Sequence, residues 1–272
     1  MTQLLILMMI IFQSFGPLAF SQVGSISLLN GILDKMEARR QPWTALKAEI
    51  ALDFITEATK QASCKGNLTY RRLDEKLILT CFNASNRLMF AFKTNDEEFE
   101  LYIPGQNTKI TGSIFDLEDS PDIDAYLKPL DLYRALKPMA ILQEQSLIEQ
   151  WTHDAITIRV HGQKHLTPYL ARKVDVSHEG DILREIYYSF SEEPYLTISR
   201  HNFHQFKLKD SASSLKISYP QKITIHYPRD KAVALSFTQI KFYSYLDEQD
   251  WIINTPSNTH LLNLDDFSAA ES

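Results

Sequence analysis

The stretch that decides the fold is Leu46-Lys-Ala-Glu-Ile-Ala-Leu-Asp-Phe54, in which an apolar residue occupies every even position. Lys47, Glu49 and Asp53 occupy odd positions between them. Because successive side chains of a strand point to opposite faces, this alternation predicts a strand with one buried and one solvated face.

Similar runs follow throughout the chain and are joined by short polar turns, which predicts an antiparallel meander. About ten strands in one domain favour a sandwich or a barrel, because a long open sheet leaves its edges exposed. We therefore expect a mainly β protein built on a strongly curved antiparallel sheet. The further strands are expected at residues 64–71, 76–82, 87–93, 98–103, 154–161, 168–178, 182–190, 194–207, 222–227 and 232–245.

Helices are expected in two places. Leu29, Ile32 and Met36 recur at helical spacing, which predicts an amphipathic helix that ends near Arg40-Gln41-Pro42. In the middle of the chain, Ser120-Pro121-Asp122 carries a helix-start signal, and Leu130 to Leu136 has a helical pattern. A helix across the mouth of a curved sheet would enclose an apolar interior, either packed by side chains or hollow for a ligand.

The amino terminus indicates the compartment. Leu4 to Phe12 is an uncharged apolar run, too short for a stable membrane anchor and typical of a secretory signal. We expect residues 1–21 to be a signal peptide that is cleaved after Ser21. An uncleaved anchor is the alternative, since no Lys or Arg precedes the run. Residues 22–256 are then a single domain, and residues 257–272 an acidic, flexible tail.

Composition argues against several functions. The chain has 272 residues and a formal net charge of -6, whereas nucleic-acid binders normally carry a basic face. It has no glycine-rich nucleotide loop and no GxSxG or HExxH motif. We therefore predict no nucleic-acid partner, no cofactor, no metal site and no catalytic residues.

The two cysteines flank a predicted hairpin. If Arg72 and Leu73 form the centre of its turn, Cys64 falls opposite Cys81, where a cross-strand disulfide is possible. The alternative is two free buried thiols, because a register slip of one residue would put them on opposite faces.

Large apolar side chains recur on the strand faces that we assign inward. They are either ordinary core or the lining of a cavity that binds acyl chains without directional chemistry. The candidate ligand-binding residues are Leu52, Phe54, Phe90, Phe92, Leu101, Tyr188, Ile225 and Phe237.

Several short motifs occur in the order and spacing of a known family. Gly66-Asn-Leu-Thr-Tyr-Arg-Arg72 is a strand that runs into a basic turn, although Leu73 stands where the family often has proline. Leu101-Tyr-Ile-Pro104, the alternating stretch from Pro220 to Pro228, and Trp251-Ile-Ile-Asn-Thr-Pro256 follow. Over residues 25–256 the chain resembles the LolA/LolB-like superfamily of outer-membrane lipoprotein-sorting proteins.

The resemblance implies an incomplete antiparallel β-barrel that is closed on one side by helices and holds acyl chains of lipoproteins or lipids. Such a protein is a non-enzymatic, monomeric periplasmic carrier in outer-membrane biogenesis. It works between membrane-bound donor and acceptor proteins and contacts the membrane transiently. The absence of a cysteine at the cleavage region argues against the lipid-anchored acceptor. The alternatives are an envelope scaffold or stress-sensing interaction domain with a packed interior, or a hydrolase with an unrecognised site.

Overall fold

The computed structural model describes residues 26–39, 43–57, 59–95, 97–119, 128–164, 167–209 and 216–264. The expected signal peptide and the helix start at Ser120 lie outside these residues. The strands are β1 (Ala45–Thr56), β2 (Thr59–Arg71), β3 (Lys76–Phe82), β4 (Leu88–Thr94), β5 (Glu98–Ile103), β6 (Thr108–Ser113), β7 (Ser146–Trp151), β8 (Ile156–Lys164), β9 (Thr167–Val176), β10 (Ile182–Tyr188), β11 (Pro194–Lys207), β12 (Lys216–Tyr227), β13 (Lys231–Tyr243) and β14 (His260–Asn263).

The helical elements are short except at the amino terminus. They are the N-terminal helix (residues 26–39), α2 (Ile114–Asp119), α3 (Pro129–Leu136), and the 3-10 turns η1 (Pro104–Gln106), η3 (Gln143–Gln145) and η4 (Glu248–Trp251). The predicted helix at Leu130 to Leu136 corresponds to α3.

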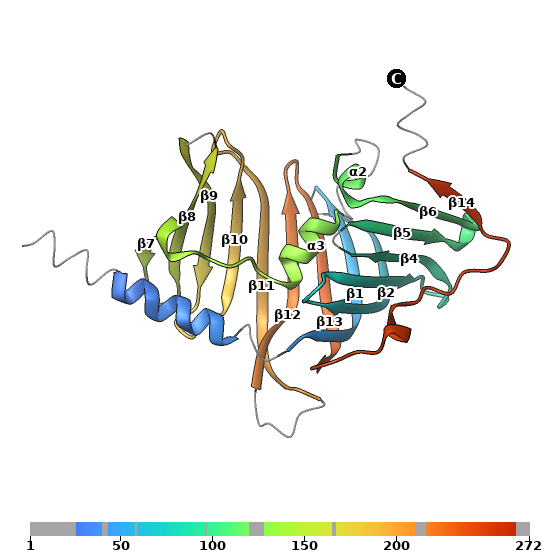
Figure 1. The fold of residues 1–272 in the computed structure, drawn as a ribbon, viewed down its shortest axis with the longest axis horizontal. Coiled ribbons are helices and arrows are strands. Elements are labelled where there is room, and N and C mark those ends of the chain that lie inside the picture. The colour runs from blue at the N-terminus through green and yellow to red at the C-terminus, as the bar shows by residue number, and fades with distance from the viewer. Residues whose placement is uncertain are drawn as a thin grey trace, which may run out of the picture.

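All strands belong to one 14-stranded sheet, in the order β14-β6-β5-β4-β3-β2-β1-β13-β12-β11-β10-β9-β8-β7. Neighbours are antiparallel, except that β14 runs parallel to β6. The sheet curves strongly without closing, and β14 and β7 are its two ends (Figure 1). The predicted fold class, an incomplete antiparallel barrel, is confirmed.

The pairing of β1 with β13 joins the first meander to the C-terminal hairpin. At this junction Leu52 lies opposite Leu235, which lies opposite Ile223 of β12. All three side chains are fully buried. Because they share one face of three adjacent strands, they form the inner wall of the curved sheet.

The N-terminal helix covers one half of the sheet. Figure 1 shows it running across β7 to β10, whereas α3 lies over the middle of the sheet. Leu29, Ile32 and Met36 form its buried stripe and pack in one apolar cluster with residues of β8 to β10. The cluster partners on the sheet are Ile156, Ile158, Val160, Val174, Val176 and Ile182.

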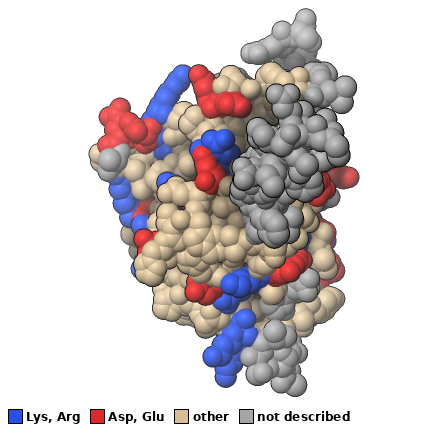
Figure 2. Space-filling model, turned by 90° about the vertical axis from the view of Figure 1, so that its left-hand side faces the viewer, with Lys and Arg blue, Asp and Glu red and all other residues tan. Residues whose placement is uncertain are grey.

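The outer surface at this end is mixed in charge. Figure 2 shows the end of the molecule that carries the N-terminal helix, with acidic and basic side chains interspersed among uncharged ones. The strand at this edge of the sheet, β7, exposes Leu147 and Trp151.

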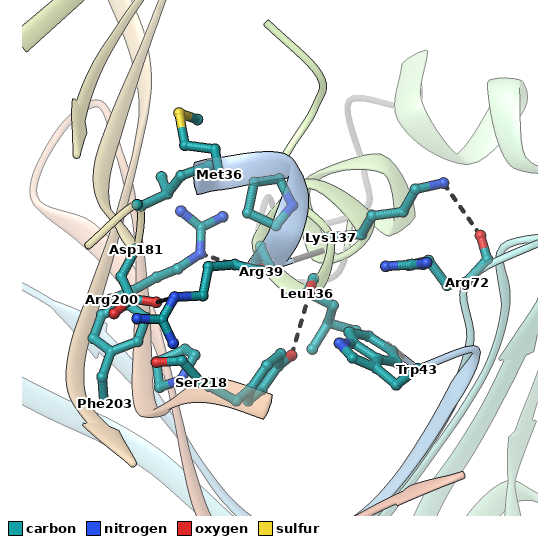
Figure 3. Close-up of a pocket in the computed structure, with 16 residues that line it drawn as sticks. Met36, Arg39, Trp43, Arg72, Leu136, Lys137, Asp181, Arg200, Phe203 and Ser218 are labelled. Atoms are coloured by element: carbon teal, nitrogen blue, oxygen red, sulfur yellow. Dashed lines mark hydrogen bonds and ion pairs between the residues drawn. The ribbon is translucent and has the colours of Figure 1, made fainter. Parts of the chain in front are cut away.

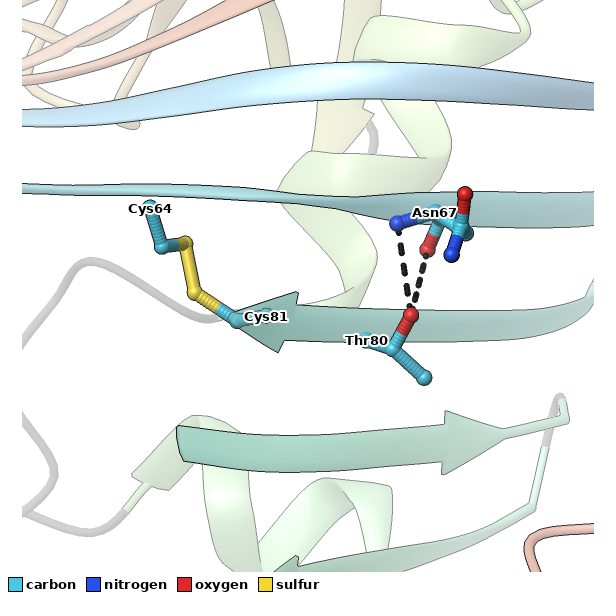
Figure 4. Close-up of a disulfide and its surroundings, with 4 residues drawn as sticks. All are labelled: Cys64, Asn67, Thr80 and Cys81. Carbon is cyan, nitrogen blue, oxygen red and sulfur yellow. Dashed lines mark hydrogen bonds between the residues drawn. A yellow bond between two sulfur atoms is a disulfide. The ribbon is translucent and has the colours of Figure 1, made fainter. Parts of the chain in front are cut away.

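Cys64 of β2 and Cys81 of β3 form a disulfide bond (Figure 4). The register that we predicted for this hairpin is wrong, because Cys81 lies opposite Gly66 and the connection contains four residues, Arg72 to Glu75. The bridge is therefore diagonal, two positions along β2. A Cβ atom on Gly66 would come within 1.8 Å of the Thr80 carbonyl oxygen, so only glycine fits opposite Cys81.

Two further expectations are corrected. The predicted flexible tail begins too early, because residues 260–263 form β14 and the Leu264 N–H donates to the Thr111 carbonyl (2.8 Å). The inward position expected for Tyr188 is also wrong. The pairing of β10 with β9 shifts between Ile182 and Arg184, and this irregularity turns Tyr187 inward instead of Tyr188.

Candidate functional site

The inner face of the curved sheet carries the main apolar cluster of the protein. Four of the eight predicted lining residues belong to it and are almost fully buried: Leu52, Phe92, Ile225 and Phe237. Phe54, Phe90 and Leu101 are half-buried and pack against it. Tyr188 belongs to neither of the two large clusters, because β10 turns it to the other face. The structure thus brings seven of the predicted residues together.

Side chains of α3 fill the mouth of this interior. Leu132, Tyr133 and Leu136 are buried in the same cluster as the inward residues of the sheet. The helix begins at Pro129, whose fixed φ suits the first helical turn. In the form described here the interior is therefore packed, with α3 as part of the packing.

Polar groups of the sheet hold the C-terminal end of α3. Three of its last four carbonyl oxygens accept a hydrogen bond from the sheet, and the fourth accepts one from the backbone directly after the helix. That of Tyr133 accepts from the Lys137 N–H (2.8 Å), those of Arg134 and Ala135 from the Arg200 guanidinium (2.8 and 3.2 Å), and that of Leu136 from the Tyr219 hydroxyl (3.3 Å).

Tyr133 and Asp131 make the polar contacts of the N-terminal half of α3. The Tyr133 hydroxyl donates to the Asn95 carbonyl oxygen (2.9 Å). Asp131, in the first turn, pairs with Arg134 (2.8 Å). Burial raises the pKa of the Asp131 carboxyl above its usual range despite this arginine.

A buried charge cluster lies behind the arginine that holds α3. Glu185 is fully buried, and its two oxygens each lie 2.8 Å from a guanidinium, one of Arg172 and one of Arg200. Arg172 also donates to the Ala140 carbonyl oxygen (3.0 Å), in the segment that follows α3. Burial and the neighbouring Glu185 charge raise the pKa of the Tyr187 phenol, which donates to the same carboxylate (3.2 Å).

Sequence reasoning missed this cluster, although the alternation contains a signal for it. Arg200 continues the inward phase of Leu196 and Ile198 on β11, and Arg172 continues that of Val174 and Val176 on β9. A charged residue in the buried phase of a strand indicates a partner inside the fold. The partner, Glu185, could not be assigned, because the irregularity in β10 reverses its phase.

A pocket of about 70 Å³ lies where the N-terminal helix, α3 and the strands β11 and β12 meet. Figure 3 shows Arg39, Arg200 and Ser218 on one side of it and Trp43, Arg72 and Lys137 on the other. Leu136 and Tyr219, which line it too, belong to the apolar cluster beneath α3. The pocket therefore adjoins the interior.

The described residues contain neither a membrane-spanning helix nor a cluster of metal ligands. No helix among them is long and apolar enough to cross a membrane. No group of three or more His, Cys, Asp or Glu side chains in this part of the chain could hold a metal ion.

Known structures share this architecture. A domain assigned to outer-membrane lipoprotein sorting in Vibrio parahaemolyticus aligns with a TM-score of 0.56 at 11% identity, over 84% of this chain and 96% of that one. A LolA superfamily protein from Nitrosomonas europaea aligns with a TM-score of 0.54 at 14% identity, over 82% and 97%. A DUF1329 family protein from Desulfovibrio piger gives 0.60 at 10% identity, over 84% and 97%.

These similarities show that the chain has the LolA-like fold. The sequence itself matches no protein-family model, and no curated protein matches it either.

Proposed function

We propose that this protein is a non-enzymatic periplasmic carrier that holds acyl chains of a lipoprotein or lipid beneath α3. The observation that carries the proposal is the apolar inner face of a LolA-like sheet whose mouth is filled by one short helix. Two of the similar structures are described as lipoprotein-sorting or LolA superfamily proteins, which supports the same role here.

A ligand can enter only if α3 moves, because α3 fills the interior. Moving it out of the mouth exposes Leu132, Tyr133 and Leu136, at a cost of about 5 to 9 kcal/mol in lost burial. An acyl chain of about sixteen carbons gains about 13 kcal/mol when it is buried in the same place. The balance favours exchange of α3 for an acyl chain and leaves binding reversible.

The polar contacts of α3 suit such an exchange. Arg200 and Tyr219 hold the C-terminal end of the helix, so this end can act as a hinge once the Tyr133 hydrogen bond is released. A ligand shifts this equilibrium only through its higher affinity for the open form. Release then follows when an acceptor protein binds the acyl chain more tightly or stabilises α3 in its closed position.

Native mass spectrometry of the mature protein, purified from its own envelope, tests the proposal, followed by denaturing extraction of bound lipid. We expect a bound phospholipid or acylated peptide. Tyr133→Phe removes the hydrogen bond to Asn95 and should raise the affinity for a fluorescent acyl probe by loosening α3. If neither form carries lipid or binds the probe at micromolar concentration, the carrier function is refuted.

The packed interior favours a second candidate, an envelope scaffold or interaction domain. Such a protein needs no opening of α3 and would bind its partners through exposed apolar residues such as Leu147 and Trp151. Purification of a partner protein in place of lipid, with no probe binding, is the result expected for this role.

A further inference from the structure

The pocket at the end of α3 contains two buried polar groups without a partner. The Arg200 side chain is only 3% exposed, and its Nε and Nη2 groups donate to carbonyl oxygens of α3. Nη2 also makes the ionic contact with Glu185 Oε2, an oxygen that accepts no hydrogen bond from the described residues. The Arg200 Nη1 group and the Ser218 hydroxyl have no hydrogen-bond partner among the described residues. Both residues line the same pocket. Because an unpaired buried polar group is costly, this pair indicates a missing acceptor in the pocket.

The charge of the surroundings favours an anion as that acceptor. Arg172 and Arg200 share one carboxylate, that of Glu185, so the buried cluster carries a net charge of +1. Such an excess charge inside a protein is unfavourable unless it is compensated.

The other charged groups of the pocket do not cancel this excess. Arg39 lies 3.9 Å from Asp181, the one carboxylate among the lining residues, so these two balance each other. Lys137 pairs with Glu75 (3.1 Å) outside the pocket, and the Arg72 guanidinium lies 5.2 Å from the centre of the Trp43 ring. The lining therefore combines several cations with a single carboxylate that already has a partner.

The rest of the lining is apolar and continues into the interior. Trp43, Leu136 and Tyr219 contact both the pocket and the cluster beneath α3. A ligand with an anionic group at Arg200 can thus extend an apolar chain into the space that α3 fills. An anion without such a chain would make no use of the apolar lining that connects the pocket with the interior.

We propose that the pocket binds the oxyanionic head group, a carboxylate or a phosphate, of an amphiphile whose acyl chain enters the interior beneath α3. Arg200 Nη1 and the Ser218 hydroxyl donate to the oxyanion. This assignment rests on the proposed carrier function and adds to it the class of ligand, a negatively charged amphiphile.

The test compares ligands with the same chain and different head groups. Dodecanoate, dodecyl phosphate and dodecan-1-ol displace the neutral probe N-phenyl-1-naphthylamine from the full mature protein at pH 8. We expect the two anions to bind about tenfold more tightly than the alcohol, the gain typical of one charge-assisted hydrogen bond. Inorganic phosphate alone should weaken the binding of the anions and leave that of dodecan-1-ol unchanged.

A matched pair of variants locates the effect. Ser218→Asp places a carboxylate of the protein beside Arg200, whereas Ser218→Asn has nearly the same size and no charge. Ser218→Asp should bind the anions no better than the alcohol, and Ser218→Asn should keep most of the preference. If the aspartate variant does not fold, Arg200→Lys, which loses the planar fork, should lose the preference instead.

The outcomes separate this inference from the carrier function. Equal affinity of the wild-type protein for all three ligands overturns the anion site and leaves the carrier in place. No binding of any of them refutes the carrier. If inorganic phosphate binds tightly but does not compete with dodecanoate, the pocket binds a free anion, and the proposal of an amphiphilic ligand is overturned.

Discussion

Replacing Glu185 by glutamine probes the interior most sharply, because it removes the carboxylate that lies between two buried guanidiniums. Both contacts measure 2.8 Å and Glu185 is 0% exposed. Removing one partner from a buried ion pair typically costs about 3 to 5 kcal/mol, since the remaining charge is left uncompensated. The glutamine oxygen can still accept from one guanidinium, so we expect a loss of about 3 kcal/mol in the free energy of unfolding.

Asp175→Asn is the matched control. Asp175 also pairs with an arginine at short distance, Arg184 Nη2 at 2.7 Å, but the Arg184 side chain is 52% exposed. An exposed pair contributes about 1 kcal/mol or less. Both substitutions remove one negative charge and keep the shape of the side chain, so the difference between them reports the burial and the partners of the two carboxylates, two guanidiniums for Glu185 and one for Asp175.

Urea unfolding at pH 7, followed by far-UV circular dichroism, measures both variants against the wild type. A loss in Glu185→Gln that is no larger than the loss in Asp175→Asn would refute the reasoning. It would mean that the two guanidiniums find other compensation and that Glu185 does not stabilise the clamp on α3.

Three further predictions concern the sheet. Replacing both cysteines with alanine should lower the free energy of unfolding by about 3 kcal/mol, measured by urea titration, and dithiothreitol should then have no effect on the variant. Gly66→Ala should destabilise by about 1 to 3 kcal/mol through contact with Thr80, whereas Gly31→Ala, with open space around it in the N-terminal helix, should stabilise by about 0.5 to 1 kcal/mol. If the melting temperatures of both glycine variants shift in the same direction from that of the wild type, this prediction is contradicted. Hydrogen bonds from Arg71 lower the pKa of the Asp74 carboxyl below its usual 3.8. The ionised carboxylate therefore stabilises the folded protein above pH 3.8, and this stabilisation is lost as the pH falls from 3.8 through the lowered pKa. Asp74→Asn should therefore lose less stability than the wild type on acidification from pH 4 to pH 2, and equal losses would exclude this linkage.

Alternation in the sequence predicted most of the sheet, because each central strand buries one face. Strands β5 and β11 have the bounds that we expected, Glu98–Ile103 and Pro194–Lys207. Strands β6, β7 and β14 were missed for physical reasons. β7, at one edge of the sheet, is mostly exposed and so buries no apolar face. The Thr108–Ser113 segment has little apolar character, and His260–Asn263 is a strand only because β6 offers it a parallel edge.

The interior was predicted in outline and the polar cluster within it was not. Leu52, Phe92 and Phe237 could be placed inward, because apolar residues alternate in the stretch around each of them. Glu185 and Tyr188 could not, because one irregularity in β10 exchanges its two faces. The contacts that hold α3 depend on register across three strands, which local sequence does not specify.

Photo-crosslinking with a diazirine-labelled fatty acid tests the central claim most directly, namely that acyl chains lie inside the curved sheet beneath α3. After irradiation of the mature protein, peptide mass spectrometry identifies the labelled residues. The account predicts labels on the inner face, at positions such as Leu52, Phe92 and Phe237, and on α3. Labels confined to the outer surface, at residues such as Leu147 and Trp151, would contradict it.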